Sequence, residues 1–346
     1  MEEDDKSCLK EAGIIIKNGG LAAFPTETVY GLGGDAFNPE SSRKIYAAKG
    51  RPSDNPLIVH ICEWDAVYKL VSDKPKHIPL LAAAKKLADA FWPGPLTVIL
   101  PKSDKVPKET TGGLDTVAIR LPAHKTARAL IAAAGGYVAA PSANISGRPS
   151  PTLAKYVLED LAGRIELIID GGPVGIGLES TIVDLTVSPP EILRPGFVTE
   201  KMLEDVLGSV RTDAALLEES PKQRPKAPGM KYRHYAPKGE LTVVSGNPEQ
   251  VVAYVNARLE EAKKEGQKTG VIATEETKER YRADLVKAAG SRTDELAAAK
   301  QLYAILREFD EYGAQILYSE AFDREGLGQA IMNRLLKAAG HRLVEV

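Results

Sequence analysis

The chain has 346 residues, which is enough for two domains of ordinary size. Its 45 lysines and arginines nearly balance 47 aspartates and glutamates, and the net charge of −2 argues against a dedicated, strongly basic nucleic-acid-binding protein. Two cysteines, Cys8 and Cys62, are too few for a four-cysteine metal site or a disulfide framework, and they favour a reducing cytoplasmic location. We expect no secretory signal in the acidic amino terminus and no membrane span.

The first 208 residues mix helical and strand-like segments. Helices are predicted at 7–19, 41–49, 77–92 and 152–161, with Ser7, Ser41 or Ser42, and Thr152 as helix caps. Strands are predicted at 21–24, 96–100, 116–121, 137–140, 165–169 and 180–185. The glycine-rich segment 25–34 is predicted to be a loop that carries two threonines, a carboxylate and a phenol. Because prolines stand at many strand ends, we expect a mixed α/β or α+β sheet and no regular βαβ winding.

The character of the chain changes after about residue 207. Residues 209–239 are predicted to be a linker, and within it 222–238 contains six lysines or arginines, three prolines and no acidic residue. From 240 to 346 strands and helices alternate. The strands are predicted at 241–244, 269–273 and 314–318, and the helices at 248–264, 293–309 and 327–339. This pattern predicts a smaller, doubly wound α/β domain with a parallel sheet, and the three parts are therefore 1–208, 209–239 and 240–346.

The stretch from Lys49 to His60 has the composition of a binding site. Lys49 and Arg51 flank a glycine at a predicted helix end, Asn55 follows on a proline-rich turn, and a short apolar strand leads to His60. A planar arginine fork and a compact lysine charge suit the oxygens of a phosphorylated substrate. The alternative interpretation is a solvated helix carboxyl terminus, where the helix dipole favours cations.

The familiar nucleotide-binding and metal-binding motifs are absent from the sequence. There is no G-x-x-x-x-G-K-[ST] loop and no cysteine and histidine cluster, and the glycines of 171–177 are typical of a tight turn between strands. A phosphate site would therefore be built from separate pieces. Beyond the two cations, Ser142 and Asn144 follow a strand, although they could equally form a turn. Arg120 and Arg194 lie near strand ends, where each needs a carboxylate, a phosphate or water.

Four motifs in order resemble the threonylcarbamoyl-AMP synthase family, which has the YrdC-like fold. They are F-P-T-E-T-V-Y-G-L-G at 24–33, K-G-R-P-S-D-N-P-L-I-V-H at 49–60, P-S-A-N-x-S-G at 141–147 and E-S-T-I-V-D at 179–184. The K-x-R…S-x-N signature of the family falls on Lys49, Arg51, Ser142 and Asn144. The resemblance covers residues 9–207. The basic linker and the following α/β domain, which we expect to be Rossmann-like, resemble the long, two-domain form of the family.

The resemblance implies a reaction in which ATP, bicarbonate and L-threonine give threonylcarbamoyl-adenylate and pyrophosphate. The product would pass to a separate transferase complex that modifies adenosine 37 of tRNA, with at most a weak tRNA contact here. Implied catalytic residues are Lys49 and Arg51. Implied ATP-binding residues are Lys49, Arg51, Asn55, Thr116, Ser142, Asn144, Ser150, Arg194 and Tyr235. Implied L-threonine-binding residues are Thr28, His60, Arg120, Ala140 and Ser180. Mg²⁺ is expected to arrive with ATP and not on a protein-ligated site.

Two further expectations follow from the linker and from competing classes. A mixed anhydride is labile in water, so the basic, proline-stiffened linker is predicted to act as a lid. The competing function is a module that binds tRNA or double-stranded RNA without catalysis, which a salt-dependent RNA affinity would favour. A related carbamoyl-transferring enzyme of hydrogenase maturation is excluded, because two cysteines cannot supply its zinc fingers.

Overall fold

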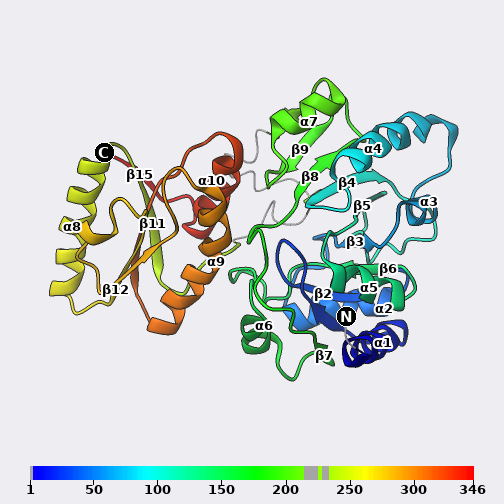
Figure 1. Cartoon of the computed structure of the whole chain (residues 1–346), viewed down its shortest axis with the longest axis horizontal. Coiled ribbons are helices and arrows are strands. Elements are labelled where there is room, and N and C mark those ends of the chain that lie inside the picture. Colours follow the sequence, from blue (N-terminus) through cyan, green and yellow to red (C-terminus); the bar gives the residue numbers. More distant parts are fainter. Residues whose placement is uncertain (1–2, 214–224, 228–233) are drawn as a thin grey trace. The chain divides into compact units, whose positions relative to one another are not determined.

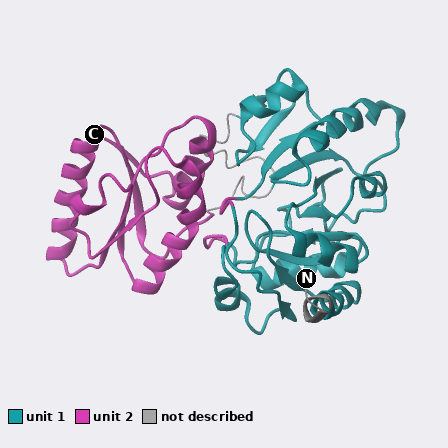
Figure 2. Cartoon of the chain, in the orientation of Figure 1, with its two compact units in different colours: residues 1–146, 151–175, 179–231 teal, residues 147–150, 176–178, 232–346 magenta. Residues whose placement is uncertain are grey.

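The computed structural model describes residues 3–213, 225–227 and 234–346. This part of the chain forms two compact units, which are shown in different colours in Figure 2. The first unit contains residues 1–146, 151–175 and 179–231, and the second contains 147–150, 176–178 and 232–346. The predicted lid, 222–238, lies partly outside the described residues. Among the residues that the structure describes, none of the helices combines the length and the apolar character that a membrane crossing requires.

A ten-stranded mixed sheet, in the order β10-β9-β8-β4-β5-β3-β6-β2-β1-β7, organises the first unit (Figure 1). Its strands are β1 (Ala22–Phe24), β2 (Gly31–Asp35), β3 (Ile58–Ile61), β4 (Leu96–Pro101), β5 (Thr116–Arg120), β6 (Tyr137–Ala140), β7 (Leu167–Ile168), β8 (Thr181–Asp184), β9 (Glu191–Arg194) and β10 (Arg211–Thr212). Its helices are α1 (Glu3–Lys17), α2 (Pro39–Lys49), α3 (Val67–Leu70), α4 (Ile78–Phe91), α5 (Lys125–Ala133), α6 (Ala154–Leu161) and α7 (Glu200–Leu207). The predicted mixed fold is confirmed.

The two faces of the central strands have different roles. Val59, Val98, Ile119 and Val183 come from four neighbouring strands and are fully buried in the main apolar core. Because side chains alternate along a strand, the residues between them point to the opposite face. That opposite face carries four of the polar residues that the sequence singled out, which are His60, Thr116, Arg120 and Arg194.

Several local predictions for the first unit were wrong. Residues 31–35 form strand β2 and not a loop, because these glycines let neighbouring side chains pack directly against the strand. The helix α1 begins before Ser7, and α2 is capped by the side chain of Asn38, which accepts a hydrogen bond from the amide of residue 40. The helix α6 begins after Leu153 without a side-chain cap, so Thr152 does not have the predicted role.

The second unit confirms the predicted doubly wound fold with a parallel sheet. Its strands, β11 (Glu240–Ser245), β12 (Thr269–Ala273), β13 (Leu285–Ala288), β14 (Ile316–Glu320) and β15 (Leu343–Glu345), pair only in parallel, in the order β13-β12-β14-β11-β15. The helices are α8 (Pro248–Lys264), α9 (Glu295–Tyr312) and α10 (Gly326–Ala338). The short edge strands of this sheet, β13 and β15, were not predicted from the sequence.

Candidate functional site

A row of polar side chains crosses the first sheet on the face opposite the main core. The strand register places Arg120 on β5 opposite His60 on β3 and opposite Thr97 on β4. Thr97 in turn lies opposite Ile182, and Ile182 lies opposite Arg194. Residues directly opposite each other in neighbouring strands point to the same face of the sheet. We call His60, Arg120, Thr97 and Arg194 the polar row.

Arg120 is the most strongly held member of the polar row. Its Nη2 donates to Oε1 of Glu27 at 2.6 Å, its Nη1 donates to Oγ1 of Thr28 at 2.9 Å, and its Nε donates to the carbonyl of Gly94 at 3.4 Å. Burial raises the pKa of Glu27, but the charge and hydrogen bond of Arg120 outweigh this effect and lower the pKa overall. The loop after β1 therefore delivers an ionised carboxylate and a hydroxyl to an arginine with a fixed orientation.

His60 is a neutral imidazole in this environment. Burial, followed by the positive charge of Arg120, lowers the pKa of His60 to about 3. Its Nδ1 lies 3.1 Å from the carbonyl oxygen of Ile58, which fits an Nδ1–H donor. The edge of Phe24 faces the ring, with 6.3 Å between the ring centroids. His60 can therefore shape a pocket or exchange a hydrogen bond, but it carries no charge at neutral pH.

Arg194 is the other end of the polar row, and it is bonded to Ser180. The Nε of Arg194 donates to the carbonyl oxygen of Ser180 at 3.0 Å, and its Nη2 donates to the Ser180 hydroxyl at 3.1 Å. The same hydroxyl lies 2.8 Å from Oγ1 of Thr97. All three side chains are nearly inaccessible to solvent. This chain of contacts joins the predicted threonine-binding residue Ser180 to the predicted ATP-binding residue Arg194.

Lys49 lies at the last residue of α2, as predicted, and Gly50 ends the helix in a left-handed conformation with φ 60°. The ammonium group of Lys49 donates to the carbonyl oxygens of Ser142 and Asn144. The hydroxyl of Ser142 donates to Oδ1 of Asn144 at 2.5 Å. The structure thus brings Lys49 against Ser142 and Asn144 of the predicted signature, which follow it by 93 and 95 positions in the sequence.

Arg51 and Asn55 are also buried, with exposed fractions of 9% and 1%. The guanidinium of Arg51 donates to the carbonyl oxygens of Asn55 and Pro56, at 3.3 and 3.1 Å. The Oδ1 atom of Asn55 is buried without a hydrogen-bond partner in the described part of the chain. Since Lys49 is only 1% exposed, the alternative of a solvated helix terminus is wrong. A buried amide oxygen without a partner is typical of a group that awaits a ligand.

The remaining predicted site residues divide between the two units. Ala140 lies opposite Ile58 in the sheet, and Thr116 precedes Arg120 on the same face of β5, so both belong to the face of the polar row. Ser150 and Tyr235 belong to the second unit. Tyr235 is buried, with φ 65°, and stacks on Tyr303 of α9 at 5.1 Å between ring centroids. The predicted ATP-binding roles of Ser150 and Tyr235 stay predictions.

A short piece of the basic linker packs on the same face of the first sheet. Ala227 is fully buried in an apolar cluster with residues of the central strands, among them Ile58, Ala118 and Ile182. Ile58 and Ala118 each lie two residues before a member of the polar row, His60 and Arg120, on the same face of their strands. The linker therefore covers part of the sheet directly beside the candidate site.

Two residues of this arrangement, Glu27 and Thr97, were not predicted from the sequence. Glu27 was visible as the one carboxylate of the 25–34 segment, and its position three residues after a strand end was the available signal. Thr97 was hidden inside an apolar strand, where a single hydroxyl between Leu96 and Val98 marks the face opposite the core. No group of three or more metal-ligating side chains occurs among the residues that the structure describes.

Comparison with known proteins identifies the family. A model described as "Telomere recombination" matches residues 14–196, and one described as "Threonylcarbamoyl-AMP synthase, C-terminal domain" matches residues 198–340. A threonylcarbamoyl-AMP synthase of Pyrococcus abyssi is 46% identical over 98% of this chain and 96% of its own length. The chain belongs to the threonylcarbamoyl-AMP synthase family. A member from Bacillus subtilis is also 46% identical, over 97% of this chain and 94% of its own length.

The fold of the chain also matches a solved structure of this family. The crystal structure of P. abyssi Sua5 complexed with L-threonine superposes with a TM-score of 0.91 at 46% identity, covering 99% of this chain and 96% of that chain. The family therefore extends through both units, and the resemblance inferred from the four sequence motifs is confirmed.

Proposed function

We propose that the chain is an L-threonylcarbamoyladenylate synthase, a nucleotidyltransferase that makes threonylcarbamoyl-AMP and pyrophosphate from ATP, bicarbonate and L-threonine. The observation that carries the proposal is the similarity, along nearly the whole chain, to proteins named threonylcarbamoyl-AMP synthase. The buried cluster of Lys49, Ser142 and Asn144 and the polar row support it, because they supply cations and hydrogen-bonding groups without an activated nucleophile.

The reaction has two chemical steps that such a site can assist. The amine of threonine must first combine with CO₂ or bicarbonate to form a carbamate. A carbamate oxygen must then attack the α-phosphorus of ATP in line and expel pyrophosphate. Neither step requires a covalent enzyme intermediate, so positioning and charge stabilisation can supply most of the rate acceleration. We assign the triphosphate and the charge that develops at the α-phosphorus to Lys49 and Arg51.

The nucleotide is assigned to residues that line the same two regions. Ser142 and Asn144 would contact phosphate or ribose, and the unpartnered Oδ1 of Asn55 would accept a hydrogen bond from the nucleotide. Arg194 and Thr116 belong to the face of the polar row, and the first is already oriented by Ser180. We also propose nucleotide-binding roles for Ser150 and Tyr235.

The amino acid is assigned to Arg120 and its neighbours. The guanidinium of Arg120 would bind the threonine carboxylate, while Glu27 and Thr28 keep its orientation. The neutral imidazole of His60, the Ser180 hydroxyl and the small side chain of Ala140 would contact the rest of the amino acid. Discrimination against serine would rest on one methyl group, which is worth about 1–3 kcal/mol.

The proposal also covers the metal ion, the partner that receives the product, the roles of the three parts of the chain and the cellular location. Mg²⁺ would arrive on the triphosphate of ATP, where it neutralises charge between the phosphate oxygens. The adenylate would pass to the transferase complex that modifies adenosine 37 of tRNA. We assign catalysis to 1–208, a lid to 209–239 and a supporting role to the Rossmann-like 240–346, and we place the protein in the cytoplasm.

Pyrophosphate release tests the proposed function directly. Purified protein should release pyrophosphate from Mg²⁺–ATP only when both L-threonine and bicarbonate are present. Release without threonine would indicate another acceptor or simple ATP hydrolysis and would contradict the proposal. If no release occurs, the RNA-binding alternative predicts an affinity for tRNA that falls steeply as the salt concentration rises.

A further inference from the structure

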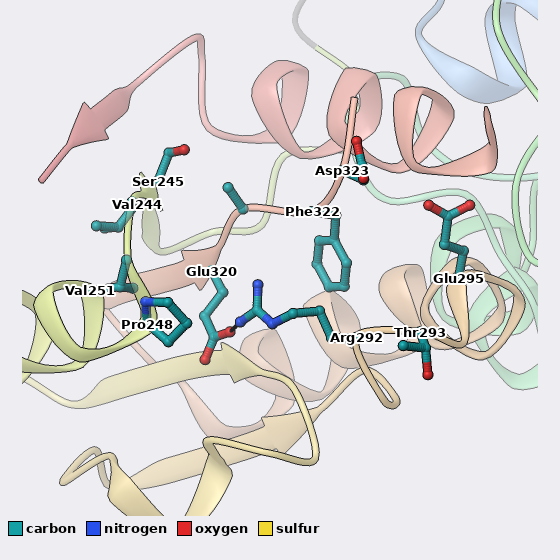
Figure 3. Close-up of a pocket in the computed structure, with 12 residues that line it drawn as sticks. Val244, Ser245, Pro248, Val251, Arg292, Thr293, Glu295, Glu320, Phe322 and Asp323 are labelled. Atoms are coloured by element: carbon teal, nitrogen blue, oxygen red, sulfur yellow. Dashed lines mark hydrogen bonds and ion pairs between the residues drawn. The ribbon is translucent and has the colours of Figure 1, made fainter. Parts of the chain in front are cut away.

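The second unit contains a cavity of about 570 Å³ that the proposed reaction does not use (Figure 3). It opens where β11 and β14 end, and the starts of α8 and α9 also contribute to its wall. Its volume lies within the range of about 300–1,000 Å³ that is typical of small-molecule sites. All of its lining residues belong to the second unit, so the cavity is complete within one compact body.

The position of the cavity in the sheet is the place where wound α/β domains bind ligands. In the strand order β13-β12-β14-β11-β15, the chain leaves β11 through α8 toward β12 and leaves β14 through α10 toward β15. These two connections run in opposite directions from adjacent strands. The carboxyl ends of such strands flank a crevice at a topological switch point. The cavity lies at the carboxyl ends of these two strands.

Arg292 is held in a fixed place on the cavity wall. The carboxylate of Glu276 accepts hydrogen bonds from the Arg292 amide at 3.0 and 3.2 Å and from the Ser291 hydroxyl at 2.6 Å, which fixes the backbone. At the other end, Nη2 of Arg292 pairs with the carboxylate of Glu320, and Figure 3 shows this contact beside Phe322. The arginine is therefore ordered from both sides before any ligand arrives.

Glu320 holds Arg292 in place, and its two carboxylate oxygens are already occupied by hydrogen bonds within the protein. Its side chain is 3% exposed. It accepts hydrogen bonds from the hydroxyls of Thr277, Tyr281 and Thr274 in addition to the ion pair with Arg292. By contrast, the Arg292 side chain is 41% exposed, and its Nε and Nη1 make no hydrogen bond to any residue in the described ranges. The unused donors of the arginine are thus the polar groups available to an anion.

The carboxylates of the other acidic residues of the wall, Asp323 and Glu295, lie at the start of α10. Oδ1 of Asp323 accepts hydrogen bonds from the amides of Arg324 and Glu325, at 2.6 and 3.2 Å. A carboxylate oxygen of Glu295 lies so close to Gly328 that a Cβ there would meet it at 2.7 Å. These two carboxylates offset the positive end of the α10 dipole. The number of cations then limits the ligand, because one arginine can bind one anionic group and not a triphosphate.

The rest of the wall is apolar, with a few hydroxyl groups. Val244, Pro248, Val251, Ala321 and Phe322 form the apolar part, and Ser245 and Thr293 supply hydroxyls. We propose that this cavity binds a nucleoside monophosphate, with the phosphate on Arg292 and the nucleoside against the apolar wall. The site is distinct from the one proposed for synthesis in the first unit, and it would let the second unit sense a small metabolite.

Equilibrium dialysis of the full chain with AMP tests this proposal. The Arg51→Ala variant serves as the starting protein, because this change should reduce AMP binding at the ATP site proposed in the first unit. The double variant Arg51→Ala, Arg292→Ala is then compared with it. Loss of a hydrogen-bonded charge should weaken AMP binding about tenfold or more. Thr293→Trp should also abolish binding, because it fills the cavity while leaving the Arg292–Glu320 pair intact. Arg282→Ala, an exposed arginine paired with Glu260 outside the cavity, is the matched control and should bind AMP as the starting protein does.

Three other small molecules test which parts of AMP the cavity recognises. Adenosine and inorganic phosphate should each bind more weakly than AMP, because adenosine lacks the phosphate for Arg292 and inorganic phosphate lacks the nucleoside for the apolar wall. Benzoate supplies an aromatic carboxylate in place of a nucleotide. The proposal is overturned if AMP fails to bind at millimolar concentration, if Arg292→Ala and Thr293→Trp leave its affinity unchanged, or if benzoate binds through Arg292 and AMP does not. Far-UV circular dichroism checks that each variant is folded.

Discussion

The two cations around Gly50 are buried by different means. Lys49 bonds the carbonyls of the Ser142–Asn144 loop, whereas Arg51 bonds the carbonyls of its own turn at Asn55 and Pro56. Burying a charge is costly unless it is hydrogen-bonded, and a site that binds a polyanion gives a reason for that cost. Two buried cations on separate supports can contact different parts of one substrate.

Substitution of Arg51 tests this assignment at the level of one residue. Arg51→Ala should lower threonine-dependent pyrophosphate release by about two orders of magnitude or more, since a group that stabilises developing charge is lost. Arg51→Lys should recover only part of the activity, because the planar fork is absent. Arg43→Ala removes an exposed arginine from the preceding helix, α2, and should have little effect. Near-normal turnover of Arg51→Ala would contradict the assignment.

The buried imidazole of His60 predicts a pH dependence of stability. Its folded-state pKa of about 3 lies below the ordinary value of 6.5, so the unfolded chain binds a proton that the folded chain does not. This difference destabilises the fold as the pH falls from about 6.5 toward 3, by up to about 5 kcal/mol. His60→Asn should flatten the decline in urea-unfolding free energy between pH 7 and pH 4. Equal slopes for both proteins would exclude this role.

At the scale of single elements, strand β2 depends on the absence of side chains. A Cβ on Gly33 would lie 2.7 Å from Cγ1 of Val138 and 2.9 Å from Cε1 of Phe24. Gly33→Ala should therefore lower the free energy of unfolding by about 1–3 kcal/mol through overpacking. Gly175→Ala is the control, because the nearest atom to its Cβ lies 3.8 Å away. Chemical denaturation of both variants measures the difference, and equal stabilities would refute the packing argument.

The sequence pattern predicted helices and strands well where the periodicity of apolar residues and the flanking residues agreed. The helix at Pro248–Lys264 and the strand at Thr269–Ala273 were predicted with the observed bounds, since their periodicity and flanking residues agree. The glycines of β2 misled the prediction, because their low strand propensity is offset by contacts with residues far away in sequence. The cap of α2 was misplaced by a few residues, because serine and asparagine are equally good caps.

The candidate site was predicted in its composition but not in its arrangement. Charge and proline content made Lys49 and Arg51 visible, and the family motifs added Ser142 and Asn144. The polar row could not be predicted, because it depends on the register between strands that lie far apart in the chain. Thr97 belongs to the row only through that register, and no local pattern reveals it.

At the scale of the whole molecule, a piece of the linker packs against the first unit. Ala227 is buried against the site face of the sheet, and the ammonium of Lys226 lies 3.6 and 3.9 Å from carboxylate oxygens of Glu191 and Asp184. The exposed lysine contributes little to stability, so the apolar contact is the more important one.

Deletion of 222–238 should leave the first unit folded but inactive in pyrophosphate release. The apolar cluster around Ile58 would lose its cover, and water would reach the proposed site. A glycine and serine replacement of the same length keeps the connection between the units and should also be inactive. Full activity of either variant would refute the lid.

The second unit is not a continuous piece of chain, since it includes 147–150 and 176–178. Within it, the buried guanidinium of Arg307 donates to the carbonyl of Pro149 at 3.2 and 2.6 Å. A protease that cuts the chain within 209–239 would thus produce two polypeptides that still share one folded body. They would migrate together on a sizing column and part only in denaturant, so the intact peptide backbone is dispensable for cohesion of the molecule.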